Sequence, residues 1–184
     1  MTLPENISTV PTTASEAFDL FDSSAAVDAD FMIGTWRGTE LPTGHPMDGL
    51  LVASGWWGKQ FVDAETVHPL LFRTRDGNAL WAMNPTIAFS GVPLARRVPQ
   101  VKNHSFARPI AAARLLSQTR TSRARLRTTR FRGVDTATMM YDQLPIDDVF
   151  RRLSDDAVIG TMDLKGVEAP YFFVLERDSS LSLR

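Results

Sequence analysis

Alternation of apolar and polar residues predicts strands through much of the chain. The segments come in pairs joined by short polar turns, of which Asp76-Gly77-Asn78 is the clearest. Glycine, asparagine and aspartate tolerate the positive φ that tight hairpin turns require. We therefore predict three strand pairs: Val67–Thr74 with Ala79–Met83, Ser122–Phe131 with Asp135–Tyr141, and Val158–Asp163 with Tyr171–Glu176.

Three other segments have the apolar spacing of helices. Ser15 can cap a short amphipathic helix, in which Phe18 and Phe21 share a face. From Leu50 to Phe61, apolar residues recur every three or four positions, which favours a helix that lies on a sheet or over a barrel mouth. Leu144–Leu153 has a proline near its start, early acids and late arginines, which also favours a helix.

A further strand is expected at Gly34-Thr35-Trp36-Arg37-Gly38. Successive side chains of a strand point to opposite faces, so Gly34, Trp36 and Gly38 would share one side. Glycine inside a strand often marks a bend or the close approach of another group. The pattern is typical of a strand in a closing barrel.

Turn and breaker residues divide the chain into one domain and two ends. Residues 1–14 are expected to form a flexible arm, 15–178 a single β-barrel domain, and 179–184 a polar tail that frays. The segment Asn84–Pro109 holds several prolines and is expected to be a long irregular connection, a type of loop that is often functional.

Composition is that of an ordinary globular protein. The chain has 184 residues, of which 43% are hydrophobic and 22% charged, and it has no cysteine. Disulfides, thiolate metal sites and cysteine nucleophiles are therefore excluded. No apolar stretch reaches the roughly 20 residues that cross a bilayer, and the N-terminus does not resemble a secretion signal, so we expect a cytoplasmic protein.

Arginine is concentrated between residues 114 and 132, although the net charge is only -1. We do not expect nucleic-acid binding, because the region lacks interleaved aromatic residues. Arg123, Arg125 and Arg127 alternate with less polar residues, as on a half-buried strand with a solvated outer face. A homodimer or an acidic partner remains an alternative use of this surface.

Six or seven strands joined mostly by hairpins, with about three short helices, predict a mainly β fold. Such a sheet is either closed or strongly curled. We expect an antiparallel β-barrel with one helix covering or flanking it.

An ordered set of motifs also resembles the bacterial GXWXG-motif family and the uncharacterised domain that usually follows it. The first part corresponds to residues 15–90 and the second to residues 120–178, with about 90–120 unmatched. The motifs are Gly34-Thr35-Trp36-Arg37-Gly38, His45–Leu51, Gly55–Lys59, Val67–Phe72, Arg132–Val134, Tyr141–Ile146, Phe150-Arg151, Met162–Gly166 and Phe172–Leu175.

This resemblance implies a calycin-like barrel, similar in plan to lipocalins and fatty-acid-binding proteins. It also implies binding of a fatty acid or similar apolar ligand, without a settled reaction. In such a barrel Trp36 would plug the closed end and pack beneath a basic side chain.

A fatty-acid carboxylate inside a barrel needs a buried cation, with a hydroxyl or second cation beside it. Tyr141 is a candidate for the hydroxyl. Arg73, with Arg125 or Arg127, is a candidate for the cation if these side chains turn inward, whereas outward arginines are commoner. Aromatic residues and methionines supply candidate apolar walls, chief among them Trp57 and Trp81.

Histidines and acid–base pairs offer other chemistry. His45 and His68 each precede a proline and are expected to be polar groups at the barrel mouth or backbone partners; their spacing does not indicate a metal site. Asp48 with Lys59, or Asp163 with Lys165, would serve acid–base catalysis only if burial shifted a pKa; capping and turn formation explain the aspartates equally well. We assign no metal ion and no cofactor.

The sequence thus predicts a binder of a hydrophobic small molecule, a fatty acid or similar acyl ligand, inside a β-barrel pocket. Two alternatives remain: a barrel enzyme, such as a cyclase or isomerase that shapes a hydrophobic substrate, and a dimeric interaction module. The predicted ligand-binding residues are His45, Trp57, His68, Arg73, Trp81 and Tyr141, beside the structural motif Gly34, Trp36 and Gly38.

Overall fold

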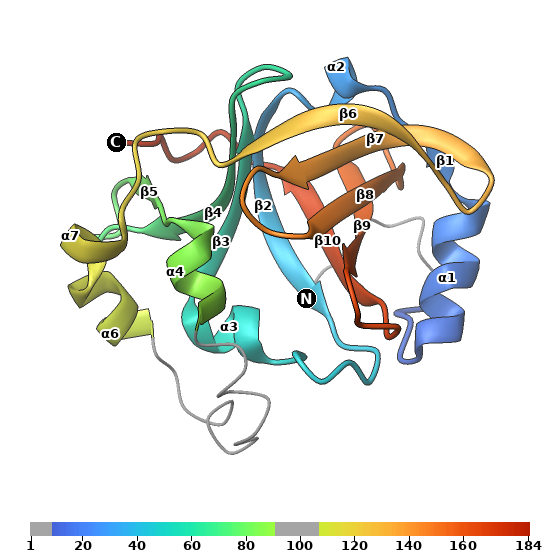
Figure 1. Cartoon of the computed structure of the whole chain (residues 1–184), viewed down its shortest axis with the longest axis horizontal. Coiled ribbons are helices and arrows are strands. Elements are labelled where there is room, and N and C mark those ends of the chain that lie inside the picture. Colours follow the sequence, from blue (N-terminus) through green and yellow to red (C-terminus); the bar gives the residue numbers. More distant parts are fainter. Residues whose placement is uncertain (1–8, 91–106) are drawn as a thin grey trace.

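One antiparallel sheet, closed into a ring, forms the body of the protein (Figure 1). The computed structural model describes residues 9–90 and 107–184. Eight strands make the ring, while β1 (Ala25–Ala26) pairs with the end of β8 and β5 (Leu80–Ala82) pairs with the end of β4. In ring order the eight are β2 (Gly34–Leu41), β3 (Trp56–Phe61), β4 (Val67–Arg73), β6 (Ala124–Phe131), β7 (Val134–Tyr141), β8 (Ile146–Arg152), β9 (Ala157–Leu164) and β10 (Tyr171–Arg177). The predicted β-barrel is confirmed.

Short helices lie around the barrel. Helix α1 begins with a capping box, in which Thr13 and Glu16 satisfy each other's backbone N–H groups, and it packs its Phe18 edge-to-face on Phe172 outside the ring. Helices α3, α4, α6 and α7 gather beside β3 and β4, away from α1 (Figure 1). The described helices are α1 (Ala14–Ser23), α2 (Ala29–Met32), α3 (Leu50–Ser54), α4 (Pro85–Ser90), α6 (Ala107–Ala112) and α7 (Arg114–Ser117). None of them is long and apolar enough to cross a membrane.

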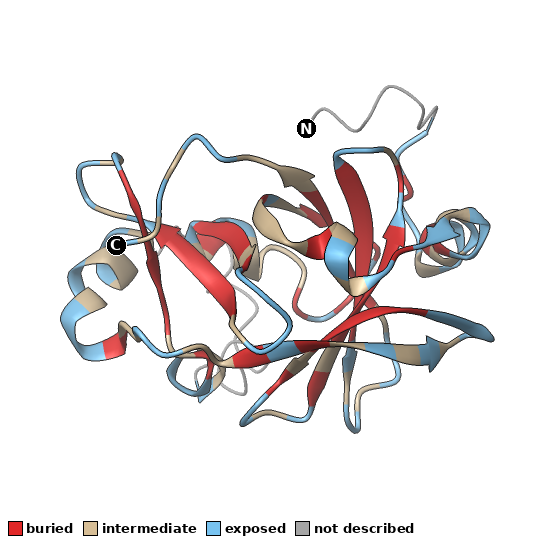
Figure 2. Cartoon of the chain, turned by 90° about the horizontal axis from the view of Figure 1, so that it is seen from above, coloured by how far each residue is buried: buried red, intermediate tan, exposed pale blue. Residues whose placement is uncertain are grey.

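The inside of the ring is filled by the protein's own side chains. Buried residues concentrate along the ring strands (Figure 2). Trp36, Phe61, Met139 and Phe150 are all at most 1% exposed and belong to one apolar cluster. The Phe61 and Phe150 rings meet edge-to-face across the barrel, with centroids 5.8 Å apart. An eight-stranded barrel is narrow enough for such contacts to fill it.

The predicted strand pairs are confirmed. Strands β6 and β7 pair along their whole length, from Ala124 opposite Tyr141 to Phe131 opposite Val134. Strands β4 and β5 pair around the Asp76 turn, and β9 pairs with β10. By contrast, a single residue pair, Val67 with Ala124, joins β4 to β6. This is the shortest strand register in the ring, and the backbone hydrogen bonds from Arg123 to Val67 and from Leu126 to Ala64 supplement it.

One predicted helix is too long, and another is wrong. Leu50–Ser54 is helical, but the chain then becomes strand β3. A β-bulge at Gly58 interrupts the alternation of apolar residues in this strand, and the resulting spacing resembles that of a helix. The expected helix at Leu144–Leu153 is strand β8, which pairs with β7 and β9. Its early acids and late arginines imitate a helix, but tertiary pairing decides the conformation.

The C-terminal tail was expected to fray, yet it is docked on β5. Backbone hydrogen bonds join Leu80 to Ser182 and Arg184, and Leu181 and Leu183 pack on the outer cluster of Trp57, Leu71, Leu80 and Ala82. Most of the predicted Asn84–Pro109 connection lies outside the described residues, apart from α4 and the start of α6.

Candidate functional site

Trp36 belongs to the apolar cluster inside the ring. Its side chain is fully buried at the barrel end that α2 covers, and its indole N–H donates to the Met32 carbonyl over 2.7 Å. The Arg177 guanidinium lies 4.3 Å from the ring and also donates to the Ile33 carbonyl over 2.9 Å. The expected packing beneath a basic side chain is confirmed, and it leaves this ring no access to a ligand.

The second glycine of the motif makes room for another tryptophan. A Cβ at Gly38 would lie 2.0 Å from the Trp56 ring, and one at Gly58 would lie 1.9 Å from the Trp36 carbonyl oxygen. The bulge between Trp56 and Gly58 also changes which face the side chains use. Trp56 therefore joins the interior cluster, whereas Trp57 joins the outer one.

The next inward residue after the bulge is Lys59, which forms an ion pair with Asp148 inside the barrel. Its Nζ lies 2.8 Å from the carboxylate, and each side chain is only 3% exposed. Strands β3 and β8 are four steps apart in either direction around the ring, so this pair spans the barrel between opposite walls. We call it the interior ion pair.

Aromatic rings surround this ion pair. The Lys59 Nζ lies 5.1 Å from the Phe173 ring centroid, 5.5 Å from that of Trp56 and 5.8 Å from that of Tyr141, and it donates to the Pro69 carbonyl over 3.3 Å. Burial raises the pKa of Asp148, and the Lys59 charge only partly opposes this effect. Burial, followed by the Asp148 charge, raises the pKa of Tyr141 well above its usual value, so the phenol stays protonated.

The buried cation is thus Lys59, which sequence reasoning had considered only as a partner for Asp48. The candidate arginines Arg125 and Arg127 instead reach acids on the surface, Asp142 at 3.5 Å and Glu65 at 2.6 Å. Tyr141 does face inward, as the predicted hydroxyl would. However, Asp148 already occupies the position that a ligand carboxylate would take beside the cation.

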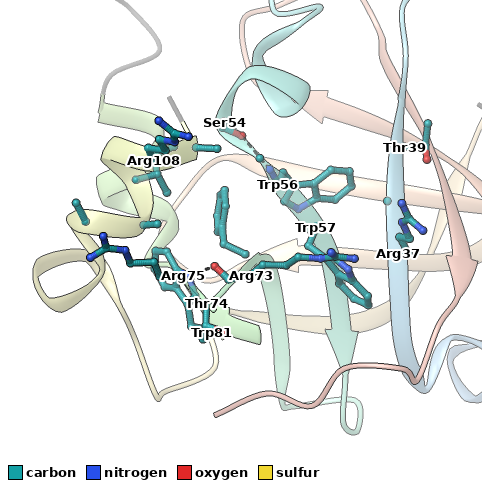
Figure 3. Close-up of a pocket in the computed structure, with 17 residues that line it drawn as sticks. Arg37, Thr39, Ser54, Trp56, Trp57, Arg73, Thr74, Arg75, Trp81 and Arg108 are labelled. Atoms are coloured by element: carbon teal, nitrogen blue, oxygen red, sulfur yellow. Dashed lines mark hydrogen bonds between the residues drawn. The ribbon is translucent and has the colours of Figure 1, made fainter. Parts of the chain in front are cut away.

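Outside the ring, a pocket of about 970 Å³ opens between α6 and the neighbouring parts of β2, β3 and β4 (Figure 3). Its described lining contains four arginines and no acid. Its indole walls include two buried N–H groups, of Trp56 and Trp57, that have no hydrogen-bond partner among the described residues. We call it the arginine–tryptophan pocket, after Arg37, Arg73, Arg75, Arg108, Trp56, Trp57 and Trp81.

The arginines of this pocket come from different elements and lie on two sides of it. Figure 3 shows Arg37 of β2 and Arg73 of β4 on the side of the Trp57 ring, with Arg75 and Arg108 on the other side. The Arg37 and Arg73 guanidinium groups also lie near Asp178. A hydrogen bond from Ser180 makes the largest contribution to lowering the pKa of this carboxyl, and the charges of Arg37 and Arg73 lower it further. The pocket therefore presents positive charge beside flat apolar surface, which suits an anion with an apolar body.

The pocket brings together three of the predicted ligand-binding residues, Trp57, Arg73 and Trp81. Trp57 and Arg73 face it from outside the ring (Figure 3). Trp81 is fully buried, and its indole N–H donates to the Arg73 carbonyl over 3.1 Å. Tyr141, in contrast, lies with the interior ion pair.

The two candidate histidines lie elsewhere. His45 accepts the Met47 N–H on Nδ1 over 3.0 Å and packs against the Tyr171 ring, with centroids 5.1 Å apart. His68 is opposite Gln60 on β3 and thus on the other face from Lys59, and its burial lowers its pKa. No cluster of potential metal ligands occurs within residues 9–90 and 107–184.

The acid–base pairs proposed from sequence do not form. The Oδ2 atom of Asp48 accepts the N–H groups of Thr43, Gly44 and His45, which makes Asp48 a loop-ordering residue. Asp163 is the penultimate residue of β9 and lies opposite Asp147, and Lys165 lies in the following turn. Asp148 was missed, because its strand was taken for a helix and its partner lies on a distant segment.

Comparison with known proteins identifies two family regions in tandem. The GXWXG protein family matches residues 19–77, and the domain of unknown function DUF4334 matches residues 122–177. No protein among the curated sequences matches significantly.

A similar fold has been solved crystallographically. The crystal structure of a protein from Thermomonospora curvata shares 34% sequence identity and a TM-score of 0.65, over 89% of this chain and 86% of that one. The chain therefore belongs to the GXWXG protein family, in the form in which a DUF4334 domain follows the GXWXG region.

Proposed function

We propose that the protein binds an apolar small molecule with an acid group, such as a fatty acid or a similar acyl ligand, in the arginine–tryptophan pocket. The observation that carries this proposal is that four arginines and three tryptophans line one pocket whose described lining has no acid. Such a lining supports an anionic head and an apolar body at the same time.

Each part of such a ligand has a chemical counterpart in the pocket. A carboxylate accepts two parallel hydrogen bonds from one guanidinium, and these charge-assisted bonds are roughly twice as strong as neutral ones. An alkyl chain or ring laid on Trp57 and Trp56 gains about 25 cal/mol for each Å² of apolar surface removed from water. Arg37 and Arg73 are therefore the anion-binding candidates, and the indoles are the apolar wall.

The barrel interior suits an acid less well than this outer pocket. Asp148 lies 2.8 Å from Lys59, so a second carboxylate there would face an existing negative charge in a desolvated site. The interior around the pair is also filled by rings such as Phe150 and Phe173. We therefore keep the ligand class that the sequence predicts, but we place its acid group in the arginine–tryptophan pocket, outside the ring.

Binding is tested by titrating the protein with dodecanoate and with dodecanol, and following intrinsic tryptophan fluorescence. We expect dodecanoate to bind and dodecanol to bind at least about tenfold more weakly, because only the acid engages arginine. Arg73→Gln should weaken dodecanoate binding by a similar factor. Arg130→Gln is the matched control, since Arg130 lies on β6 and faces Asp135.

Equal affinities for the acid and the alcohol, or equal losses in the Arg73 and Arg130 variants, would contradict an anion site in this pocket. Salt provides an independent check. Raising the ionic strength should weaken dodecanoate binding and leave dodecanol binding unchanged.

A further inference from the structure

The interior ion pair has no part in the proposed ligand binding, yet it is costly to maintain. Lys59 and Asp148 are each only 3% exposed, and apolar residues of similar size are often at least as stable in such positions. A charged pair held across a barrel of aromatic rings therefore calls for an explanation beyond stability. Aspartate and lysine side chains that burial and neighbouring charges tune are among the groups that act as general acids and bases.

The pair lies directly behind the arginine–tryptophan pocket. Trp56 lines the pocket, and the same ring has the Lys59 ammonium 5.5 Å from its centroid. The indole N–H of Trp56 has no hydrogen-bond partner among the described residues, so packing against Gly38 and the Phe173 ring holds the indole in place. Trp56 is the ring that the pocket and the ion pair share, and a substrate has to displace it to pass from one to the other.

We propose that Lys59 and Asp148 form an acid–base centre that interconverts the ketone and enolate forms of an apolar carbonyl compound, and shifts the C=C bond where that compound is unsaturated. The acid end of this substrate would remain on the pocket arginines, which is the part of the inference that rests on the proposed function. The carbonyl end would pass Trp56 and reach the two charged groups, which have to separate from their 2.8 Å contact to receive it.

The reaction balances without any co-reactant. The Asp148 carboxylate removes a proton from the carbon next to the carbonyl, and the C–H electron pair becomes the C=C bond of an enolate. The carbonyl π electrons move to its oxygen, whose negative charge develops beside the Lys59 ammonium. Protonated Asp148 returns the proton to the same carbon, which restores the ketone, or to the far end of a conjugated system, which moves the double bond.

The surroundings support each role. The rings of Trp56, Tyr141 and Phe173 limit water around the pair, which strengthens the interaction of Lys59 with a developing enolate oxygen. The same rings offer stacking surface to a conjugated substrate. The substrate class is therefore an apolar, carbonyl-containing acid with an acidic C–H beside the carbonyl.

The test is hydrogen exchange in D₂O. The probes are phenyl ketones that carry a carboxylate at the end of a methylene chain of graded length, and proton NMR follows loss of the hydrogen beside the ketone. We expect at least one chain length to exchange much faster with protein than with buffer. Asp148→Asn should slow this exchange by at least about 100-fold, the lower range for loss of a general base.

Two controls keep the result clear if Asp148→Asn folds poorly. The double variant Lys59→Met with Asp148→Leu replaces the pair by apolar residues, which proteins often tolerate. It should fold and lose the exchange. Asp147→Asn, the preceding residue on the opposite face of β8, should fold and keep it.

Failure of this inference is distinct from failure of the proposed function. If the keto acids bind in the pocket but none exchanges, or if the double variant still exchanges, the acid–base centre is refuted while ligand binding stands. If none of the acids binds, the proposed function fails, and butyrophenone, a neutral ketone, then tests the centre alone. Protein-dependent exchange of butyrophenone that Asp148→Asn abolishes would uphold the centre, and no exchange would overturn it.

Discussion

The Trp56 ring occupies the space directly over Gly38, where an added Cβ would lie 2.0 Å from the ring edge. This contact links the family motif on β2 to the wall between the arginine–tryptophan pocket and the interior ion pair. The motif therefore supports the site indirectly, through the position of Trp56.

The first prediction concerns this contact. Gly38→Ala should lower the free energy of unfolding by about 1–3 kcal/mol, because the added methyl group overpacks the site. Urea unfolding measures the effect. Trp56→Leu combined with Gly38→Ala should cost less than the sum of the two single variants, since the smaller side chain relieves the overlap. Additive costs would show that the two residues do not compete for space.

Local sequence patterns predicted the hairpins and the motif strand well. The turn at Asp76-Gly77-Asn78 and the alternation around Arg125 depend on neighbouring residues, which a sequence displays directly. The position of Trp36 beneath a basic side chain followed from the family resemblance, although Arg177 itself was not foreseen.

The candidate site was harder to predict, because long-range contacts create it. The bulge at Gly58 turns Trp57 outward and Lys59 inward, and no local pattern marked it. Asp148 was read as an early acid of a helix, although it is an inward residue that Lys59 neutralises from the opposite wall. A buried charge breaks the apolar alternation by which strands are recognised.

The second prediction concerns the interior ion pair. Lys59→Met should destabilise the protein by about 3–5 kcal/mol, because it leaves Asp148 buried without a partner. Adding Asp148→Leu should restore most of that loss. Chemical denaturation of the two variants and the wild type measures both steps. A double variant that is as unstable as Lys59→Met would show that the interior needs the charges for folding.

The third prediction concerns pH. Burial lowers the pKa of His68, so the folded protein binds this proton less readily than the unfolded chain does. Neutral His68 makes its full contribution to the free energy of unfolding above the unfolded pKa of about 6.5. As the pH falls below that value, this contribution is lost by at most about 1.4 kcal/mol per pH unit.

His68→Gln isolates this effect. Urea unfolding at about pH 7.5 and about pH 5.5, on either side of the unfolded histidine pKa, should show a smaller stability loss in the variant than in the wild type. The difference between the two proteins removes the contribution of other titrating groups. An identical loss in both would mean that His68 titrates normally in the fold.

The fourth prediction concerns the C-terminal tail. Leu181 and Leu183 cover the outer cluster that contains Trp57, and Trp57 lines the pocket. Leu181→Ser with Leu183→Ser should therefore lower the melting temperature, at a cost of about 1 kcal/mol for each leucine. Dodecanoate binding should weaken as well.

Ser182→Ala is the matched control for the tail. Residue 182 contributes only its backbone carbonyl to the Leu80 N–H, so this variant should behave like the wild type. Unchanged stability in the leucine variant would show that the docked tail adds nothing to the barrel.

The most direct measurement is a crystal structure of the protein with dodecanoate bound. We expect electron density for the carboxylate on Arg37 or Arg73, with the alkyl chain on the Trp57 and Trp56 rings in the arginine–tryptophan pocket. Density for the acid inside the ring, on Lys59 in place of Asp148, would refute binding at this pocket, as would an arginine–tryptophan pocket that stays free of ligand at saturating dodecanoate.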